Sequence, residues 1–575
     1  ARLARKKASE EKDPQRKAEL EKIAEICRQV PANPARTFRE ALQSLWFYHV
    51  ALWMEHNAIA VCAGRIDQYL YPYYKKDIEE GKLTREQAQE LLECLWVKFS
   101  EMHFFLNKAA AEIQPGYVAF QDITCGGITE SGQDAVNELS YMMLQATMDV
   151  RLAEPHLSVK YNKAKNPDSF LRKAVELAAL GTGHPPFHND ERGIRYVLDW
   201  GIPFDEAYNW SPRGCMEVGL MGKCGSLSSH QCINTAVVLE LALLNGVHRR
   251  TQTRLPVPQT GDPRTFRTYE EFKGAVKAQL SYLIKKACET GQMVEVMQQH
   301  YRPVLVTSLS FEECIENAKD LLAGGAKYNP GPDIVIGGTT DFANSLAAVK
   351  KLIYEDKKLT WDELLEALDN DFEGYEQIQE MCLAAPKYGN DIPEVDEIAT
   401  EITRFAAEEV RKYRGLHGGR RSVMSGGAAI HLIYGAHAGA LPSGRKAWVP
   451  LADGISPMQG TDRKGPTAVL KSISKCCLDL YTRGSLINMK FDPSLFNDER
   501  GIGDFMSLIK SWHDLGLYHI QFNVVSPEIL REAQKHPEKY RGLLVRVSGY
   551  SAYFVELDRG IQEDIISRTT QETMA

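Results

Sequence analysis

One apolar, β-forming run near the end of the chain constrains the fold most, because a single glycine interrupts it. The run covers residues 543–554, Leu-Leu-Val-Arg-Val-Ser-Gly-Tyr-Ser-Ala-Tyr-Phe, and the glycine is residue 549. Branched and aromatic residues at this density indicate a strand. A lone glycine among small neighbours indicates a tight turn that needs a positive φ. The sequence therefore predicts a strand that enters a turn at Gly549.

The residues around this glycine match a longer pattern. The segment Arg-Val-x-Gly-Tyr-Ser-Ala-x-Phe over residues 546–554 resembles the glycyl radical signature of the pyruvate formate-lyase-like enzymes. Flanking segments that resemble the same family lie at 519–525, 533–540 and 562–569. The resemblance implies that Gly549 carries a glycine radical, so that the radical belongs to the protein and no cofactor is bound permanently.

Radical chemistry explains why this position is a glycine. An unpaired electron on Cα delocalises between the amide nitrogen and the carbonyl, provided that the centre can flatten. A side chain would oppose flattening and crowd the loop, and Gly549 has none. Because oxygen would react with the radical and cleave the chain, the resemblance also implies a buried site and an anaerobic, cytoplasmic setting.

A second candidate site lies in residues 209–219, Asn-Trp-Ser-Pro-Arg-Gly-Cys-Met-Glu-Val-Gly. Of 12 cysteines, only Cys215 follows a Pro-x-Gly turn and has a carboxylate, Glu217, two residues on. The Gly-Cys-x-Glu segment that begins at Gly214 resembles the motif of the glycerol-, choline- and hydroxyproline-type branches. Pyruvate formate-lyase proper has two adjacent cysteines here, whereas this chain has Met216, so the acyl-carrier role has no obvious bearer.

The resemblance implies a radical relay through these residues. The radical on Gly549 takes a hydrogen atom from the Cys215 thiol, and the thiyl takes one from a substrate carbon. Glu217 then acts as general base on an adjacent hydroxyl or amine, which speeds loss of a leaving group. Residues two apart in an extended segment face the same side, so one substrate can reach both. A structural alternative for Glu217 is a salt bridge to Arg213 or Lys223.

Three further positions are candidate substrate-binding residues, namely Ile59, Ala60 and His230. The first two precede residues 64–72, whose Gly-Arg-x-Asp-Gln-Tyr-x-Tyr-Pro pattern again resembles the family. Relatives that eliminate water or an amine tend to carry polar or acidic residues just before this segment. The apolar Ile59 therefore disfavours a dehydratase. His230 lies where related enzymes have pocket residues, and it is a candidate proton donor to a leaving group.

Composition narrows the class of partner. The chain of 575 residues has a formal net charge of −8 and no basic block interleaved with aromatic residues, which disfavours a nucleic acid partner. No apolar run approaches the roughly 20 residues that cross a bilayer. The cysteines are scattered, which favours reduced thiols, and their spacing predicts no metal site. The one adjacent pair, Cys476 and Cys477, is interpreted as structural.

Local patterns predict the first elements. Residues 9–30 read as one surface helix, and capping boxes begin helices at Thr37 and Thr84. Short β-rich runs at 333–336 and 520–525 alternate with helical segments, which indicates an α/β fold.

The resemblance refines this into an α/β barrel of ten strands, formed by two parallel five-stranded halves set antiparallel and surrounded by helices. The loops that carry Cys215 and Gly549 would enter its lumen. We divide the chain into a barrel domain, residues 1–440, and a C-terminal glycyl radical domain, residues 441–575. The resemblance begins near Pro34, well inside the usual family chain, so we expect that an N-terminal portion of a typical member is absent.

The radical needs an external source. The chain has no Cys-x3-Cys-x2-Cys cluster, so the resemblance implies a separate S-adenosylmethionine-dependent iron–sulfur activating enzyme, which reaches Gly549 when the C-terminal segment swings out. A homodimer is usual in the family. Three functions stay open: a dehydratase-like radical lyase acting on a small molecule, favoured by Glu217; a formate acetyltransferase or other C–C cleaving or decarboxylating enzyme, favoured by the apolar run at Ile59; and an inactive fragment or scaffold.

Overall fold

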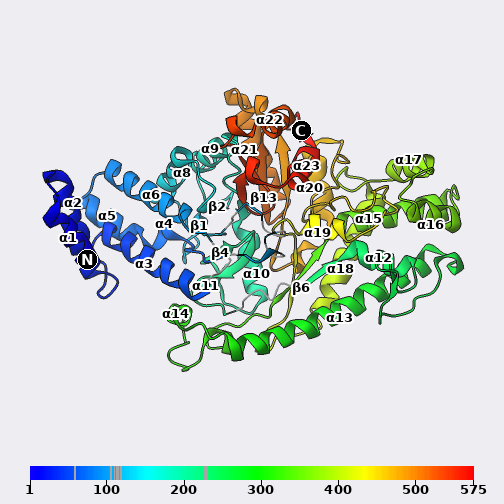
Figure 1. Ribbon diagram of the computed structural model, residues 1–575, viewed down its shortest axis with the longest axis horizontal. Coiled ribbons are helices and arrows are strands. Elements are labelled where there is room, and N and C mark those ends of the chain that lie inside the picture. Colours follow the sequence, from blue (N-terminus) through cyan, green and yellow to red (C-terminus); the bar gives the residue numbers. More distant parts are fainter. Residues whose placement is uncertain are drawn as a thin grey trace.

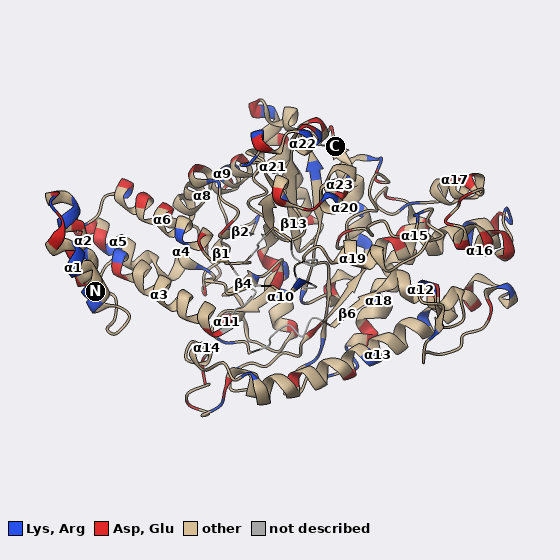
Figure 2. Ribbon diagram, viewed as in Figure 1, with Lys and Arg blue, Asp and Glu red and all other residues tan. Residues whose placement is uncertain are grey.

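The computed structural model describes residues 1–56, 60–103, 106–108, 111, 115–116, 119–225 and 231–574. The molecule is elongated, with strands at its centre, the first helices at one end and α16 and α17 at the other (Figure 1). Among the helices in these ranges, none combines the length and the apolar character needed to cross a bilayer. Both signs of charge occur along the outer helices (Figure 2).

Ten strands form the two larger sheets of the described chain. They are β1 (Asp122–Gly126), β2 (His156–Tyr161), β3 (Phe187–Asn189), β6 (Gln231–Asn234), β9 (Asp333–Gly337), β10 (Ser422–Ser425), β11 (Gly484–Ser485), β12 (Asn488–Phe491), β13 (His519–Val524) and β16 (Thr570–Gln571). Hairpins are formed by β4 (Trp210–Arg213) with β5 (Glu217–Leu220), β7 (Val247–His248) with β8 (Thr253–Arg254), and β14 (Leu544–Arg546) with β15 (Ser551–Tyr553).

The order of the strands brings distant parts of the chain together. The first sheet runs β1-β2-β3-β13-β12-β16, and the second runs β11-β10-β9-β6. Neighbours are parallel in both sheets except β3 and β13, which pair antiparallel with His188 opposite His519. The predicted runs at 333–336 and 520–525 are β9 and β13.

Helices cover the outside of the strands (Figure 1). They are α1 (Arg2–Glu10), α2 (Pro14–Gln29), α3 (Phe38–His56), α4 (Ile66–Tyr69), α5 (Tyr71–Glu79), α6 (Arg85–Ser100), α8 (Glu138–Val150), α9 (Asp168–Ala179), α10 (Asp190–Asp199), α11 (Phe204–Ala207), α12 (Thr235–Leu243), α13 (Tyr269–Tyr301), α14 (Leu305–Ser308), α15 (Thr339–Val349), α16 (Trp361–Asp369), α17 (Glu376–Ala384), α18 (Pro393–Val410), α19 (Ile430–Ala436), α20 (Gly465–Lys475), α21 (Glu499–Asp514), α22 (Pro527–Lys535) and α23 (Arg559–Ser567).

Local capping explains where several helices begin. The capping box at Thr84 is confirmed, because Thr84 and Gln87 bond reciprocally at the start of α6. At α3 only half of the predicted box forms: Thr37 accepts the Glu40 amide, and the Glu40 carboxylate binds Arg36 instead. The single helix predicted over residues 9–30 is wrong, since α1 ends at Glu10 and Asp13 caps a new helix, α2.

The two faces of the central strands differ in polarity, as the period of two along a strand allows. On β1, Ile123 packs in the larger apolar cluster, whereas Thr124 lies 2.9 Å from the Ser211 hydroxyl of β4. On β13, Ile520 packs in that cluster, whereas Gln521 accepts a hydrogen bond from Arg546 of β14 at 2.7 Å. The strands therefore turn a polar face toward the two hairpins β4–β5 and β14–β15.

A buried carboxylate anchors the segment that leads into β1. Glu154 accepts the backbone amides of Ala119 at 3.0 Å, Phe120 at 2.8 Å and Gln121 at 3.1 Å. Burial raises the pKa of Glu154 to about 7, although these bonds act in the opposite direction. The Phe120 ring packs edge-on against Tyr550, with centroids 5.4 Å apart, so this anchor also supports the turn beside β14.

Replacing this anchor is expected to destabilise the fold. Glu154→Ala leaves three backbone donors without their acceptor, so the free energy of unfolding should fall by about 2–5 kcal/mol. Urea denaturation followed by tryptophan fluorescence measures the change.

Glu154→Gln is the matched control, because it keeps the shape and cannot titrate. A carboxyl whose pKa is raised from 4.5 to about 7 contributes stability at low pH that is lost as the pH rises to about 7. The wild type should lose more stability than Glu154→Gln across this window. Equal stability of Glu154→Ala and the wild type would contradict the anchoring role.

Candidate active site

The tips of two hairpins meet in the space that the strands of the two larger sheets surround. The first tip is the turn Gly214-Cys215-Met216 between β4 and β5, and the second contains Gly549 between β14 and β15. A Cβ atom placed on Gly549 would stand 2.2 Å from Cys215 Cβ and 2.8 Å from Cys215 Sγ. Gly549 therefore packs directly against Cys215, although the two are far apart in the sequence.

Both backbone conformation and space require glycine at position 549. Its φ is +83°, in the region that side chains rarely adopt. The turn closes with a hydrogen bond of 2.8 Å from the Val547 amide to the Tyr550 carbonyl. The predicted strand and turn are present, with β14 before the glycine and β15 after it. An alanine at this position would meet the Cys215 side chain and backbone.

The thiol of Cys215 lies in an enclosed environment. Only 8% of the residue is exposed, and the Ala428 amide donates a hydrogen bond to Sγ at 3.2 Å. Burial and, next, the charge of Glu217 raise the pKa of the Cys215 thiol well above its ordinary value. The sulfur therefore keeps its proton near neutral pH, and the S–H form is the one that can give up a hydrogen atom.

Glu217 begins β5 and folds back over the turn. Its Oε2 accepts the Met216 amide at 3.1 Å and would stand 2.8 Å from a Cβ on Gly214. Of its two suggested salt-bridge partners, Lys223 pairs with Glu206 and Glu312, each at 3.2 Å. The structure thus brings the carboxylate to the Cys215 turn.

Two neighbours of this turn, Cys62 and Asp122, were not predicted from the sequence. The Cys62 thiol donates to Asp122 Oδ2 at 3.1 Å, and a hydrogen bond with the Gly214 backbone acts on the Cys62 pKa. Burial raises the pKa of Asp122 well above its ordinary value, and the charges of Glu154 and Glu217 act in the same direction. The only signal in the sequence was a carboxylate at the start of a buried β-run.

A cavity of about 310 Å³ lies next to the β4–β5 hairpin, where Arg213 and Gly219 line it but Cys215 and Glu217 do not. Its wall includes Ala60, one of the predicted substrate-binding residues, together with Cys62, Arg213 and Arg483. The other two predicted contacts, Ile59 and His230, lie outside the described residues.

The adjacent cysteines lie elsewhere in the fold. Cys476 is buried in the larger apolar cluster, 3.5 Å from the Tyr388 hydroxyl, whereas Cys215 belongs to the cluster around the hairpins. This packing supports the structural interpretation of Cys476 and Cys477.

Comparison with known proteins identifies the class. A family model described as pyruvate formate lyase-like matches residues 1–435, and one described as glycine radical matches residues 451–555. Trans-4-hydroxy-L-proline dehydratase of Clostridioides difficile is 39% identical over 582 residues, which cover 99% of this chain and 72% of that protein. Isethionate sulfite-lyase of Bilophila wadsworthia is 37% identical over 585 residues, which cover 100% of this chain and 70% of that protein.

A solved structure agrees. The glycerol-bound B12-independent glycerol dehydratase of Clostridium butyricum superposes with a TM-score of 0.96 at 37% identity, over 100% of this chain and 72% of that one. The chain belongs to the glycyl radical enzymes of the pyruvate formate lyase-like family. Within that family it is a dehydratase-like radical lyase, and the expected α/β barrel is confirmed. The family keeps its radical in the protein itself.

The contact between the hairpins gives a steric prediction. In Gly549→Ala, the added Cβ overlaps Cys215, so the tip of the second hairpin cannot seat. Amide hydrogen exchange in residues 543–556 should become at least about tenfold faster. Gly542→Ala is the control, because a Cβ there meets no atom within 4 Å. Unchanged exchange in Gly549→Ala would contradict the observed packing.

The raised pKa of Cys215 gives a second prediction. Since only the thiolate is alkylated, the rate of Cys215 modification by iodoacetamide should stay low up to pH 9 and rise only above it. Glu217→Gln removes a negative charge that raises this pKa, so the midpoint of the rise should move to lower pH. Mass spectrometry of the Cys215 peptide measures both rates. A wild-type midpoint below pH 9 would refute this account.

Proposed function

We propose that Gly549, Cys215 and Glu217 carry out a radical elimination on a small molecule. The observation that carries the proposal is the contact between Gly549 and the Cys215 side chain. The Gly549 radical takes the hydrogen atom of the Cys215 thiol, which gives an intact glycine and a thiyl. The thiyl then takes a hydrogen atom from a substrate C–H bond and leaves a carbon radical.

The proposed elimination depends on Glu217, whose side chain contacts the Cys215 turn. Its carboxylate takes the proton of a hydroxyl or amine on the radical carbon, and the leaving group departs from the neighbouring carbon as an anion or, once protonated, as a neutral molecule. The product radical recovers a hydrogen atom from Cys215, and the thiyl recovers one from Gly549. The net reaction loses the leaving group and regenerates the glycyl radical.

The substrate class is proposed from the relatives, which favour a small hydroxylated molecule with an acidic group. Arg213 and Arg483 lie in the wall of the cavity, but Arg483 donates to the backbone carbonyls of Val218 and Gly331, so the wall does not carry this proposal. Two relatives are named for such molecules, the amino acid trans-4-hydroxy-L-proline and the sulfonate isethionate. Ala60 also lines this cavity, and Ile59 and His230 stay predicted contacts.

The proposal includes the partners of the family. A separate S-adenosylmethionine-dependent iron–sulfur activating enzyme would install the radical. In this proposal residues 1–440 form the barrel domain and residues 441–575 form the glycyl radical domain. We further propose an anaerobic, cytoplasmic homodimer. Burial of Cys215 is consistent with the need to keep the radical site away from dissolved oxygen.

Electron paramagnetic resonance tests the radical. Anaerobic protein incubated with an activating enzyme, S-adenosylmethionine and a reductant should give an organic radical split into a doublet by one hydrogen on Cα. Gly549→Ala should give none. A signal that persists in Gly549→Ala would place the radical elsewhere.

Turnover tests the other two roles. Cys215→Ser should form the radical but release no leaving group from any hydroxylated acid or polyol. Glu217→Gln should keep the radical and lower kcat by about 100-fold or more, the usual effect of a general base. Release of water, amine or sulfite from an intact carbon skeleton is the readout. Turnover by Cys215→Ser, or cleavage of a C–C bond, would refute the assignment.

A further inference from the structure

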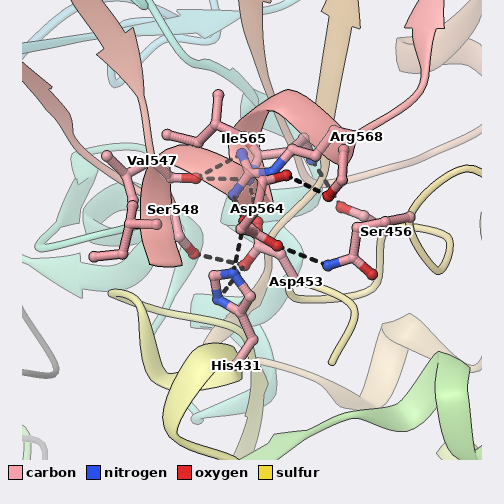
Figure 3. A network of polar contacts seen from close by, with 12 residues as sticks. His431, Asp453, Ser456, Val547, Ser548, Asp564, Ile565 and Arg568 are labelled. Carbon is pink, nitrogen blue, oxygen red and sulfur yellow. Dashed lines mark hydrogen bonds and ion pairs between the residues drawn. The ribbon is translucent and has the colours of Figure 1, made fainter. Parts of the chain in front are cut away.

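The two residues that immediately precede Gly549, Val547 and Ser548, are held by side chains from other parts of the chain (Figure 3). Ser548 donates its hydroxyl to Asp453 Oδ1 at 2.6 Å. The Val547 carbonyl accepts from Arg568 at 2.8 Å and from Asn488 at 3.3 Å. Each contact fixes the approach of the chain to Gly549, and we call the three residues that make them, Asp453, Asn488 and Arg568, the clamp.

The Asp453 side of this clamp comes from the loop that follows α19. Its carboxylate is buried, with 4% of the residue exposed, and its second oxygen accepts a hydrogen bond from Asn488 of β12. Asn488 also reaches the Val547 carbonyl, so a strand of the central sheet joins the same contact. The backbone before Gly549 is thereby tied to the rigid part of the fold.

The Arg568 side comes from the end of α23. Arg568 is the C-cap residue of this helix and binds Asp564 Oδ2 at 2.8 Å. Asp564 also accepts from His431 of α19 at 3.1 Å and from Gln459 at 2.8 Å. Burial acts to raise the pKa of Asp564, but the charges of Arg568 and His431 outweigh it and hold that pKa well below its usual range.

His431 connects the two sides. Its Nε2 faces Asp564, and its Nδ1 lies 3.8 Å from Asp453 Oδ1 (Figure 3). The two sides of the clamp thus share one residue of α19, and neither belongs to the hairpin that they hold.

We propose that Asp453 and Arg568 are positioning residues that set how long Gly549 stays opposite Cys215. This inference rests on the proposed function, in which hydrogen transfer needs the hairpin seated and activation needs it withdrawn. Apolar packing of Val547 and Tyr550 holds the hairpin inside, but hydrogen bonds are directional and fix its position. Water can also replace the side chains as hydrogen-bond donors to the backbone carbonyl, so the clamp can open without breaking a covalent bond.

The clamp predicts opposite effects on two steps. Asp453→Asn turns one acceptor into a donor that faces the Asn488 amide, and Arg568→Lys keeps the charge beside Asp564 but loses the planar fork that also reaches Val547. In both variants, the activating enzyme should install the radical faster, and turnover should fall with little change in KM. Loss of folding would lower both rates, so it cannot produce this pattern.

Hydrogen exchange on the protein before activation gives a direct readout. Amides in residues 543–556 should exchange about tenfold faster in both variants, because a hydrogen bond to a charged group is lost, while β1 and β13 stay as protected as in the wild type. Asp462→Asn is the matched control, because among the described residues this carboxylate accepts from the side chains of Thr569 and, at 3.0 Å, of Gln571, which both lie beyond α23 and outside the hairpin.

The outcomes separate the two proposals. Wild-type exchange at 543–556 in Asp453→Asn and Arg568→Lys, or faster exchange spread over β1 and β13, would overturn the clamp. The exchange experiment needs no radical, so it holds even if the wild type gives no paramagnetic doublet, a result that would overturn the proposed function alone. A doublet in the wild type with unchanged exchange in both variants would overturn the clamp alone.

Discussion

The direct packing of a glycine turn against a cysteine turn is the constraint on which the rest of the site depends. Gly549 sits where a Cβ would overlap Cys215, so the two backbones approach more closely than two ordinary residues could. Such an approach needs both turns to be held from outside. The strands provide this support, because β13 binds the base of the second hairpin through Gln521 and Asn523.

The polarity of the central strands follows from what they enclose. A sheet face buried against helices is apolar, as at Ile520, but the inner face meets two hairpins whose backbone and side-chain polar groups need partners. Asn523 exchanges two hydrogen bonds with the Arg546 backbone, at 2.7 and 2.8 Å. The interior is thus a polar scaffold around a smaller apolar cluster that contains Val547 and Tyr550.

Electrostatics divides the site into two regions. Near Cys215, burial and the charge of Glu217 raise the thiol pKa, and burial raises the pKa of Asp122 as well, which favours groups that retain hydrogen. Near α23, Arg568 and His431 keep Asp564 ionised despite its burial. The thiol of Cys215 and the carboxyl of Asp122 therefore tend to keep their hydrogens, with Glu217 as a charged neighbour, whereas a charged network lies behind the hairpin, where directional contacts position the backbone.

The sequence by itself determined which residue types can carry the chemistry, namely a glycine at a turn and a cysteine two residues before a carboxylate. It also determined the helix start at Thr84. Each of these features depends only on neighbours in the chain. The sequence also indicated an α/β fold from local periodicity. Only the tertiary structure decided that Asp122 and Cys62 stand beside the Cys215 turn and that Asp453 holds Ser548. These contacts join segments that no local pattern relates, since they arise from strand order and from the packing of hairpins inside the strands.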